Sequence, residues 1–261
     1  MSEPDTDRAE RSAIEYLRNR RALVTGASSG IGRAVALKLA NSGAHVLGSG
    51  RDEEQLEETR RRSAPHARLD ILSGDLSVAE VRRSIFKKLP NPDVAVLCAG
   101  ILRHCPILDS DPQDWHDIIE INLLTTMVLA KELAGRMVAA GEGHIVLIGS
   151  TLAKAIRPTT AAYAASKCGL SAFAQGLRAE VEGKGIKITE VSPGFTESNV
   201  RRDVTNPEAL RLISSAARSA LAPEDVAEAV ADVLSKPAHV VIDELTLRGV
   251  TASGGAERGA Q

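Results

Sequence analysis

The chain has 261 residues, a length that suits one large α/β domain with an ample core. Its formal net charge is -2, with basic and acidic residues interspersed, so the composition gives no reason to expect a nucleic acid or an anionic membrane as partner. The three cysteines lack CxxC spacing, so we expect no disulfide framework and no metal site. No apolar run approaches the roughly 20 residues that span a bilayer, and the N-terminus lacks the apolar core of a signal peptide, which favours a cytoplasmic location.

Both ends of the chain are polar and lack an apolar pattern. We expect residues 1–18 to form a flexible N-terminal tail and residues 250–261 a flexible C-terminal tail. Residues 19–249 are then expected to form a single folded domain, because no linker-like stretch interrupts them.

The first expected strand, Arg21 to Thr25, runs into a glycine-rich turn. The turn reads Gly26-Ala-Ser-Ser-Gly-Ile-Gly32, and a helix follows it until Gly43. Glycines there could serve only a tight turn, but a strand before them and a helix after them favour a phosphate cradle, where free amides and the helix dipole face an anion. The spacing is neither GxGxxG nor the Gly-Lys-Ser/Thr ending of a triphosphate loop, which argues against a kinase or an ATPase.

The end of the second expected strand, residues 44–50, concerns the choice of cofactor. A carboxylate at this point usually accepts from the ribose hydroxyls of NAD(H), but here Gly50 stands there and Arg51 follows. Arg51 could pair with a 2′-phosphate, or it could be a solvated side chain before a helix capped by Asp52. We therefore expect NADP(H), with NAD(H) less favoured.

Two further strands are expected at residues 67–72 and 93–99. Between them, Asp75 is placed to accept from an adenine amino group, although acidic residues at strand ends are often turn formers. We expect Ser77 to cap the next helix. After the second of these strands, Asp111 caps a helix that is expected to reach Ala140, and Asn122 lies inside it as a functional residue or a satisfied core amide.

The stretch from Ser150 to Lys167 carries the strongest chemical pattern. Ser150 follows an apolar strand at residues 144–149, so its hydroxyl emerges at the carboxyl end, where open α/β sheets bind ligands. Tyr163 and Lys167 are four residues apart and share one helix face, and a nearby cation favours the phenolate. Taken alone, the tyrosine and the lysine are ordinary helix residues. Together with Ser150 and the glycine turn, they indicate a catalytic site.

The remaining chain completes an alternating pattern. We expect a strand at residues 187–192 leading into Pro193-Gly194, a mobile lid at about residues 196–221, a helix from Pro223 and a last strand at residues 239–247. Seven strands that alternate with helices predict a single Rossmann-like domain of the α/β class, with a doubly wound, mostly parallel sheet flanked by helices.

From about Arg21 to Leu247 the chain resembles the short-chain dehydrogenase/reductase family. The resemblance rests on the joint spacing of the glycine turn, Asn122, and Ser150 with Tyr163 and Lys167. It implies an oxidoreductase in which Tyr163 is the general acid or base, Ser150 orients the substrate oxygen, Lys167 holds the nicotinamide ribose and Asn122 anchors a water. The expected cofactor site comprises Thr25, Gly26, Ser28, Ser29, Gly30, Ile31, Gly32, Arg51, Asp75, Leu76, Ala99, Gly100, Tyr163, Lys167, Pro193, Gly194 and Thr196, with Ser198 a further candidate.

Two segments depart from the usual family pattern. Leu97-Cys98-Ala99-Gly100 replaces the common Asn-Asn-Ala-Gly, which puts the local hydrogen bonding in doubt. The C-terminal region is similar to a subgroup that acts with NADP on 3-hydroxy acids, β-hydroxy amino acids and related small aldehydes. The resemblance therefore implies a small polar carbonyl or alcohol substrate and a homodimer or homotetramer.

Several basic side chains are candidates for substrate contacts. Arg103, His104, Arg157, Arg201 and Arg202 could clamp a carboxylate, although arginines in loops are more often solvated. The alternative function is a catalytically silent nucleotide-binding or scaffold protein on the same fold, which a broken catalytic set would favour. The spacing of Tyr163 and Lys167 argues against enoyl reductases, and the size and glycine spacing argue against sugar-nucleotide epimerases.

Overall fold

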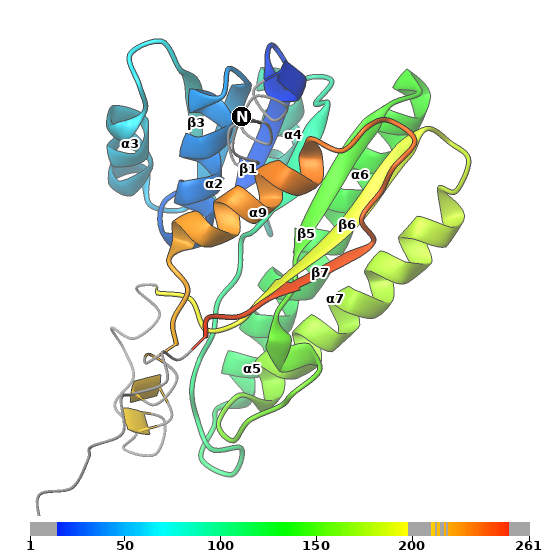
Figure 1. Cartoon of the computed structure of the whole chain (residues 1–261). Coiled ribbons are helices and arrows are strands. Elements are labelled where there is room, and N and C mark those ends of the chain that lie inside the picture. The colour runs from blue at the N-terminus through cyan, green and yellow to red at the C-terminus, as the bar shows by residue number, and fades with distance from the viewer. Residues whose placement is uncertain (1–14, 198–209, 212, 215–216, 218, 251–261) are drawn as a thin grey trace, which may run out of the picture.

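In this computed structural model, seven parallel strands form one sheet in the order β3-β2-β1-β4-β5-β6-β7 (Figure 1). The structure describes residues 15–197, 210–211, 213–214, 217 and 219–250. The strands are β1 (Arg21–Thr25), β2 (His45–Gly50), β3 (Arg68–Ser73), β4 (Val94–Leu97), β5 (Gly143–Ile148), β6 (Ile186–Pro193) and β7 (Glu244–Leu247). The expected doubly wound α/β sheet is confirmed, and every strand pair in it is parallel.

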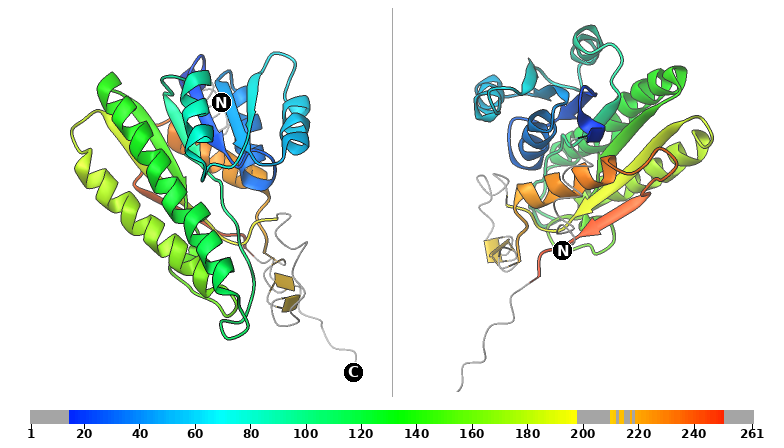
Figure 2. Two further views of the ribbon diagram at one scale, coloured as in Figure 1. Left: turned by 180° about the vertical axis from the view of Figure 1, so that it is seen from behind. Right: turned by 45° about the horizontal axis from the view of Figure 1, so that its top comes forward.

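Helices cover both faces of the sheet. The longer ones are α2 (Gly30–Asn41), α3 (Glu53–Arg62), α4 (Ala79–Lys88), α6 (Thr125–Ala140), α7 (Ala161–Glu180) and α9 (Pro223–Leu234). One apolar cluster joins the sheet to α2 and α9, and a second joins it to α4, α6 and α7. Figure 1 looks toward α2 and α9, whereas the left view of Figure 2 shows α6 and α7 from behind. Because parallel strands are buried on both faces, β1, β4 and β5 read as nearly continuous apolar runs.

The strand order reverses next to β1. The chain goes outward from β1 to β2 and β3, then crosses back to place β4 on the other side of β1. The connections at the carboxyl ends of β1 and β4 therefore lead in opposite directions, which opens a crevice between them. This switch point places the glycine turn after β1 beside the loop after β4.

The helix expected from Asp111 to Ala140 has an irregularity in its middle. Asp111 caps α5 (Pro112–Ile119) by accepting from the amide of Gln113, as expected. A π-helical turn, η1 (Glu120–Leu124), then separates α5 from α6, and it carries Asn122. π-helical turns inside helices often accompany functional sites, because they change the direction of the side chains they carry.

Three sequence-based details differ in the structure. Ser77 does not cap α4, which starts at Ala79 after Val78; the Ser77 amide instead donates to Asp75 in a local turn. The last strand is shorter than expected, because residues 239–243 run as a loop before β7. Leu17, placed by the sequence in a flexible tail, is fully buried in the cluster with α2 and α9. The expected lid falls largely on residues outside the described part of the chain.

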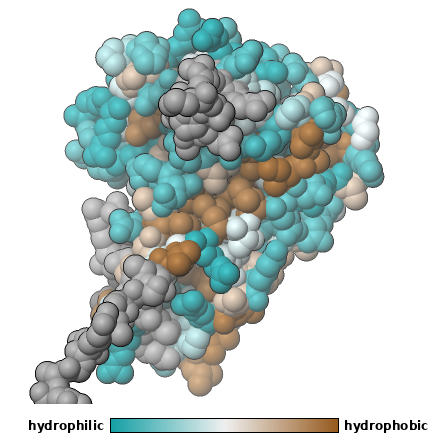
Figure 3. Space-filling view, viewed as in Figure 1, coloured by the Kyte–Doolittle hydropathy of each residue, from teal (hydrophilic) through white to brown (hydrophobic). Residues whose placement is uncertain are grey.

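Two groups of apolar side chains stay exposed on this single chain. Trp115, Ile119 and Leu124 lie along α5 and η1, and Val240 and Val241 precede β7 at the edge of the sheet. In Figure 3, a band of hydrophobic residues crosses the middle of the face where α9 and β7 lie in Figure 1. Among the helices that the structure describes, none is long and apolar enough to cross a membrane.

Candidate active site

A cavity of about 490 Å³ opens at the carboxyl ends of the strands, at the switch point of the sheet. It is continuous from the glycine turn to the start of α7. Among the expected site residues, its walls include Gly26, Ser28, Ser29, Gly30, Ile31, Gly32, Arg51, Asp75, Leu76, Ala99, Gly100, Ser150, Tyr163, Lys167, Pro193, Gly194 and Thr196. The cavity thus brings together nearly all the residues that the sequence assigned to a site, from elements spread over the whole chain.

The glycine turn between β1 and α2 has the geometry of an anion cradle. Gly26 and Gly30 have φ values of +70° and +51°, which L side chains rarely adopt. A Cβ on Gly32 would collide with the main-chain oxygen of Gly26, so the first turn of α2 closes on the loop only because glycine is there. The three glycines therefore leave the backbone at the start of α2 uncovered at these positions of the cavity wall, as an anion site at a helix N-terminus requires.

Thr25 lies beneath this turn and not on the cavity wall. It is 2% exposed, and its Oγ1 accepts from the amides of Cys98 at 2.9 Å and Ala99 at 3.0 Å. The expected place of Thr25 on the cofactor surface is therefore wrong. Its side chain instead supports the cavity wall from the interior of the protein. The same contacts resolve the doubt raised by Leu97-Cys98, because the Thr25 hydroxyl ties the end of β4 to the end of β1.

A second set of hydrogen bonds behind the turn was missed by the sequence reasoning. Arg33 Nε donates to Thr59 Oγ1 at 2.9 Å, and Thr59 Oγ1 donates to the Ala27 oxygen at 2.9 Å. The Arg33 guanidinium also donates to the main-chain oxygen of Ser28 and to Gln55 Oε1. These contacts fasten the cradle to α3, the helix that begins just after Arg51. No motif in the sequence indicates them, because the contacts with Thr59 and Gln55 join residues more than 20 positions apart.

The far end of the cavity holds one cation and one anion. Arg51 follows β2 on the cavity wall, and Gly50, which precedes it, offers no carboxylate. Asp75 accepts from the Ser77 amide at 2.8 Å, and this main-chain hydrogen bond lowers the pKa of its carboxyl group. Asp75 is therefore an ionised turn former that also lines the cavity.

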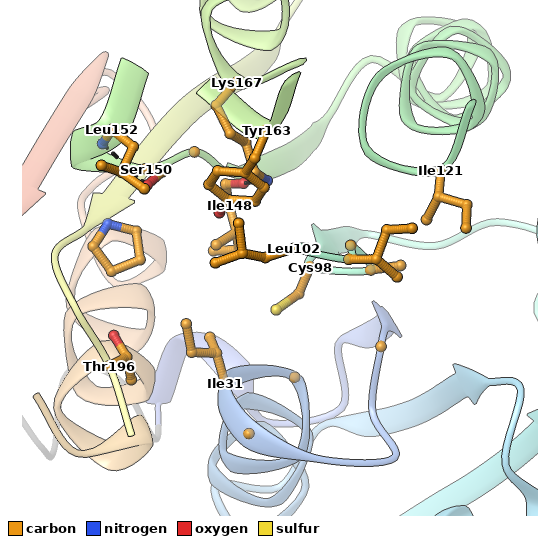
Figure 4. Close-up of a pocket in the computed structure, with 18 of the residues that line it drawn as sticks. Ile31, Cys98, Leu102, Ile121, Ile148, Ser150, Leu152, Tyr163, Lys167 and Thr196 are labelled. Atoms are coloured by element: carbon orange, nitrogen blue, oxygen red, sulfur yellow. Dashed lines mark hydrogen bonds between the residues drawn. The ribbon is translucent and has the colours of Figure 1, made fainter. Parts of the chain in front are cut away.

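Ser150, Tyr163 and Lys167 meet on one side of the cavity, opposite Ile31 of the glycine turn and Thr196 (Figure 4). Ser150 lies directly after β5, and its Oγ accepts from the Leu152 amide at 3.1 Å. Lys167 Nζ donates to the Ile148 oxygen at 2.7 Å and lies 5.7 Å from the centre of the Tyr163 ring. One strand end and one helix face thus deliver a hydroxyl, a phenol and an amine to one place.

Burial dominates the protonation of these groups. It raises the pKa of Tyr163 to about 12, although the hydrogen bond with the Ser150 hydroxyl acts in the opposite direction. It also lowers the pKa of Lys167 to about 8. The sequence led us to expect that Lys167 would favour the phenolate, but in this structure desolvation outweighs that effect. Tyr163 is therefore a neutral phenol and a proton donor at neutral pH.

The Asn122 side chain is fully buried and uses both of its polar ends. Oδ1 accepts from the Ile101 amide at 2.7 Å, and Nδ2 donates to the Ile101 oxygen at 2.8 Å and to Ser166 Oγ at 3.2 Å. The Ser166 hydroxyl in turn donates to the main-chain oxygen of Tyr163 at 2.6 Å. Asn122 therefore fixes the loop after β4 to the helix that carries Tyr163. Its expected part in anchoring a water stays a prediction.

The basic side chains near the site divide into two kinds. Arg103 does not line the cavity, because Asp114 and Asp117 bind its guanidinium at 3.1 and 3.3 Å. His104 and Arg157 do line it. So does Arg248, which the sequence reasoning missed and which follows β7 with its side chain against Gly194. Arg201, Arg202 and Ser198 lie outside the described residues.

The Pro193-Gly194 turn is held by the edge strand. The Gly194 amide donates to the Leu247 oxygen at 2.8 Å, and Thr196 Oγ1 donates to the Gly194 oxygen at 3.1 Å. β7 thus fixes the turn that closes the cavity beside Ser150, and the residue after Leu247 is Arg248. A sequence reader could have found Arg248 from its place one residue past the last strand.

A family model described as short chain dehydrogenase matches residues 20–209, well over half of the chain. The chain belongs to the short-chain dehydrogenase family. An uncharacterised oxidoreductase of Staphylococcus saprophyticus is 31% identical over 240 residues, which cover 90% of this chain and 99% of the relative. Glycine betaine reductase of Emericella nidulans is 32% identical over 232 residues, 87% of this chain but only 18% of that longer protein.

Solved structures agree with this membership. A closed form of serine dehydrogenase complexed with NADP+ superposes with a TM-score of 0.80, at 29% identity over 92% of this chain and 99% of that one. An actinorhodin polyketide ketoreductase with NADPH has a TM-score of 0.78, at 30% identity over 88% of this chain and 96% of that one. This short-chain dehydrogenase is therefore an oxidoreductase acting on CH–OH and C=O groups, as its relatives' names and its family indicate.

Proposed function

We propose that this short-chain dehydrogenase transfers a hydride between NADP(H) and a small polar carbonyl compound or secondary alcohol, with Tyr163 as general acid or base. The observation that carries the proposal is the meeting of Ser150, Tyr163 and Lys167 on one wall of a cavity that continues to the glycine turn. The catalytic set is intact, which argues against a silent scaffold on the same fold.

The chain's residues fit a dinucleotide. The cradle of Gly26, Gly30 and Gly32 leaves amides free for a pyrophosphate, and a side chain at any of these positions would be strained or would collide. When bound, the nicotinamide supplies or accepts the hydride. Lys167 and the Pro193-Gly194 turn would hold its ribose and ring. The structural neighbours solved with NADP+ and NADPH support this assignment.

The preference for NADP(H) over NAD(H) rests on Arg51. No carboxylate stands at the end of β2 to repel a 2′-phosphate. Within the described part of the chain the Arg51 guanidinium makes no hydrogen bond or ion pair, although it acts electrostatically on the nearby Asp75 carboxylate. A guanidinium on the cavity wall with its donors unused is suited to a bidentate contact with a phosphate group.

The proton chemistry follows from the neutral phenol. Tyr163 would donate its proton to the carbonyl oxygen during reduction, and the Ser150 hydroxyl would orient and polarise that oxygen. In the oxidative direction Tyr163 must first lose its proton, which its raised pKa makes costly unless the Lys167 cation assists. Reduction therefore starts from the protonation state that Tyr163 already has at neutral pH, whereas oxidation needs a deprotonation first.

The substrate end of the cavity combines apolar walls with two cations. Leu102 and Leu152 supply apolar surface, and Arg157 and Arg248 bring guanidinium groups. Neither guanidinium group has a hydrogen bond or ion pair with other residues that the structure describes. A small polar substrate with a negative charge suits these walls, in line with the resemblance to dehydrogenases of hydroxy acids.

We also propose a homodimer or homotetramer. The exposed side chains of Trp115, Ile119 and Leu124 along α5 and η1, and the apolar band near β7, are the surfaces that a second copy would cover. Light scattering of the purified protein tests this, and a monomer would contradict it.

Two measurements test the proposed activity. Fluorescence titration should show tighter binding of NADPH than of NADH, and a panel of small keto acids and aldehydes should include a compound that oxidises NADPH. Equal binding of the two nucleotides would defeat the Arg51 argument, and a panel without any turnover would count against the substrate class.

A further inference from the structure

Glu190 is a buried carboxylate that the chemistry described above does not use. It lies in β6 between β5 and β7 and is 2% exposed. Its Oε1 accepts from Ser192 Oγ at 2.9 Å, whereas its Oε2 has no hydrogen-bond partner. An ionised carboxylate with one free oxygen is costly to bury, unless an opposite charge compensates it.

Lys167 is the buried cation placed to do so. Lys154, whose pKa is raised by Glu244 and to a lesser extent by Glu190, is exposed and binds Glu244. Among the residues described, only Lys167 and Glu190 are buried with a formal charge, apart from His144. Burial lowers the pKa of His144 to about 3, so this imidazole is neutral. It forms a hydrogen bond with Thr189, from β5 to β6. The interior of the described chain thus holds one positive and one negative charge.

Both charged side chains contact the main chain at the end of β5. Lys167 Nζ donates to the Ile148 oxygen, and the next residue, Gly149, packs directly against the Glu190 carboxylate. A Cβ on Gly149 would collide with Glu190 Oε1 and with Ser192 Oγ, so glycine is needed for this approach. Glu190 pairs in register with Leu147, whose side chain lies in the cluster that α7 covers. Glu190 therefore faces the helix that carries Lys167.

The other charged groups on this face have partners of their own. Glu244, the register neighbour of Glu190 on β7, binds Lys154 at 2.8 Å. Arg178 of α7 binds Asp243 and donates to the main-chain oxygens of Ile188 and Asp243. Burial raises the pKa of the Cys98 thiol to about 12, so it is uncharged near Lys167. Glu190 remains as the anion that acts on Lys167.

We propose that Glu190 is the counter-ion of Lys167, and that it holds the lysine in its protonated form from the neighbouring strand β6. Glu190 touches neither substrate nor cofactor, so it is a positioning residue that acts through Lys167. The role rests on the proposed function, since the cation matters there for binding the ribose and for lowering the pKa of Tyr163. Burial lowers the pKa of Lys167, and Cys98 and Glu190 oppose that effect. Because burial raises the pKa of the Cys98 thiol to about 12, this thiol is uncharged at neutral pH, and Glu190 is left as the anion that acts on Lys167.

The direct test measures the protonation of Lys167 without cofactor or substrate. Wild-type protein is labelled with trace acetic anhydride between pH 6 and 10, and peptide mass spectrometry follows the reactivity of Lys167 against pH. Glu190→Gln keeps the shape and removes the charge, so the midpoint should fall by about one pH unit. Glu244→Gln makes the same change one strand away, and Ser192→Ala removes the hydrogen bond but keeps the charge; both should leave the midpoint near that of the wild type.

A second measurement links the carboxylate to the cofactor. NADPH affinity of the four proteins is followed by fluorescence between pH 7 and 10, where Glu190→Gln should lose affinity at lower pH than the others. Glu190→Asp should restore part of the shift, and thermal melts confirm that each variant is folded. An unchanged Lys167 labelling midpoint in folded Glu190→Gln would overturn the proposal that Glu190 is the counter-ion. Absence of NADPH binding to the wild type would overturn the proposed function instead, and the labelling would still decide on Glu190.

Discussion

The side chain of Asn122 forms two hydrogen bonds with the main chain of Ile101, accepting from its amide at 2.7 Å and donating to its oxygen at 2.8 Å. A π-helical turn makes this possible by pointing a fully buried asparagine at the loop after β4. The loop lines the cavity, and Ser166 connects the same amide to the main chain at Tyr163. Cofactor loop and catalytic helix are thereby held as one unit.

Asn122→Ala should therefore weaken both stability and catalysis. It leaves the Ile101 amide and oxygen without their partner in a partly buried place. Because water can reach part of this site, urea unfolding should show a total loss of about 1–3 kcal/mol. NADPH affinity should also fall, because the loop loses its fixed position. Asn122→Asp, which keeps the acceptor but cannot donate while ionised, should also be destabilised. Unaltered stability of both variants would show that the two hydrogen bonds with Ile101 contribute little.

Gly32→Ala should disrupt the cradle. Its Cβ would collide with the Gly26 oxygen, so the turn must open, and we expect a loss of about 1–3 kcal/mol in stability together with loss of NADPH binding. Gly135→Ala is the matched control, because Gly135 lies on the exposed side of α6 with nothing within 4 Å of its added Cβ. That change should raise stability by up to about 1 kcal/mol, since alanine is the better helix former. Tight NADPH binding by Gly32→Ala would contradict the cradle.

Arg51→Asp should reverse the cofactor preference. The new carboxylate would repel a 2′-phosphate and could accept from ribose hydroxyls, so the NADPH affinity should fall and the NADH affinity should rise. Fluorescence titration with both nucleotides measures the ratio. Arg68→Asp, on an exposed position at the start of β3, controls for the change in net charge. If both variants behave alike, Arg51 has no specific contact with the cofactor.

Arg157→Ala and Arg248→Ala should raise the KM for a keto acid. Each removes an unpaired guanidinium from the cavity wall, and a charge-assisted contact contributes about 1.5–3 kcal/mol, or about 10- to 150-fold in affinity. Arg103→Ala is the control, because Arg103 is held by Asp114 and Asp117 outside the cavity. The KM for a neutral ketone of similar size should change little in all three. Equal effects on the charged and the neutral compound would argue against an anion contact.

Much of the fold and site could be predicted from the sequence, because the signals were local. The glycine turn, Ser150 at a strand end and the spacing of Tyr163 and Lys167 each depend on residues close together in the chain. Strand alternation then fixed the parallel sheet, and the parallel sheet brings strand ends to one edge. The cavity accordingly contains most of the residues expected there.

What the sequence missed depends on contacts between distant residues. Thr25 points to the amides of Cys98 and Ala99, about 70 positions away, so it supports the site from behind. The burial that keeps Tyr163 neutral comes from side chains of several strands and helices, and no motif encodes it. Glu190 looks like an ordinary polar residue in a strand until β5 and α7 close over it.

Tyr163→Phe tests the account most directly. The change removes one hydroxyl from a ring that stays packed in place, so the folded structure and NADPH binding should persist. Turnover of NADPH with a reactive small carbonyl compound should fall to background, because the phenol of Tyr163 is the group that we assign to donate the proton. Turnover near the wild-type rate in this variant would contradict the assignment of Tyr163 and, with it, the proposed mechanism.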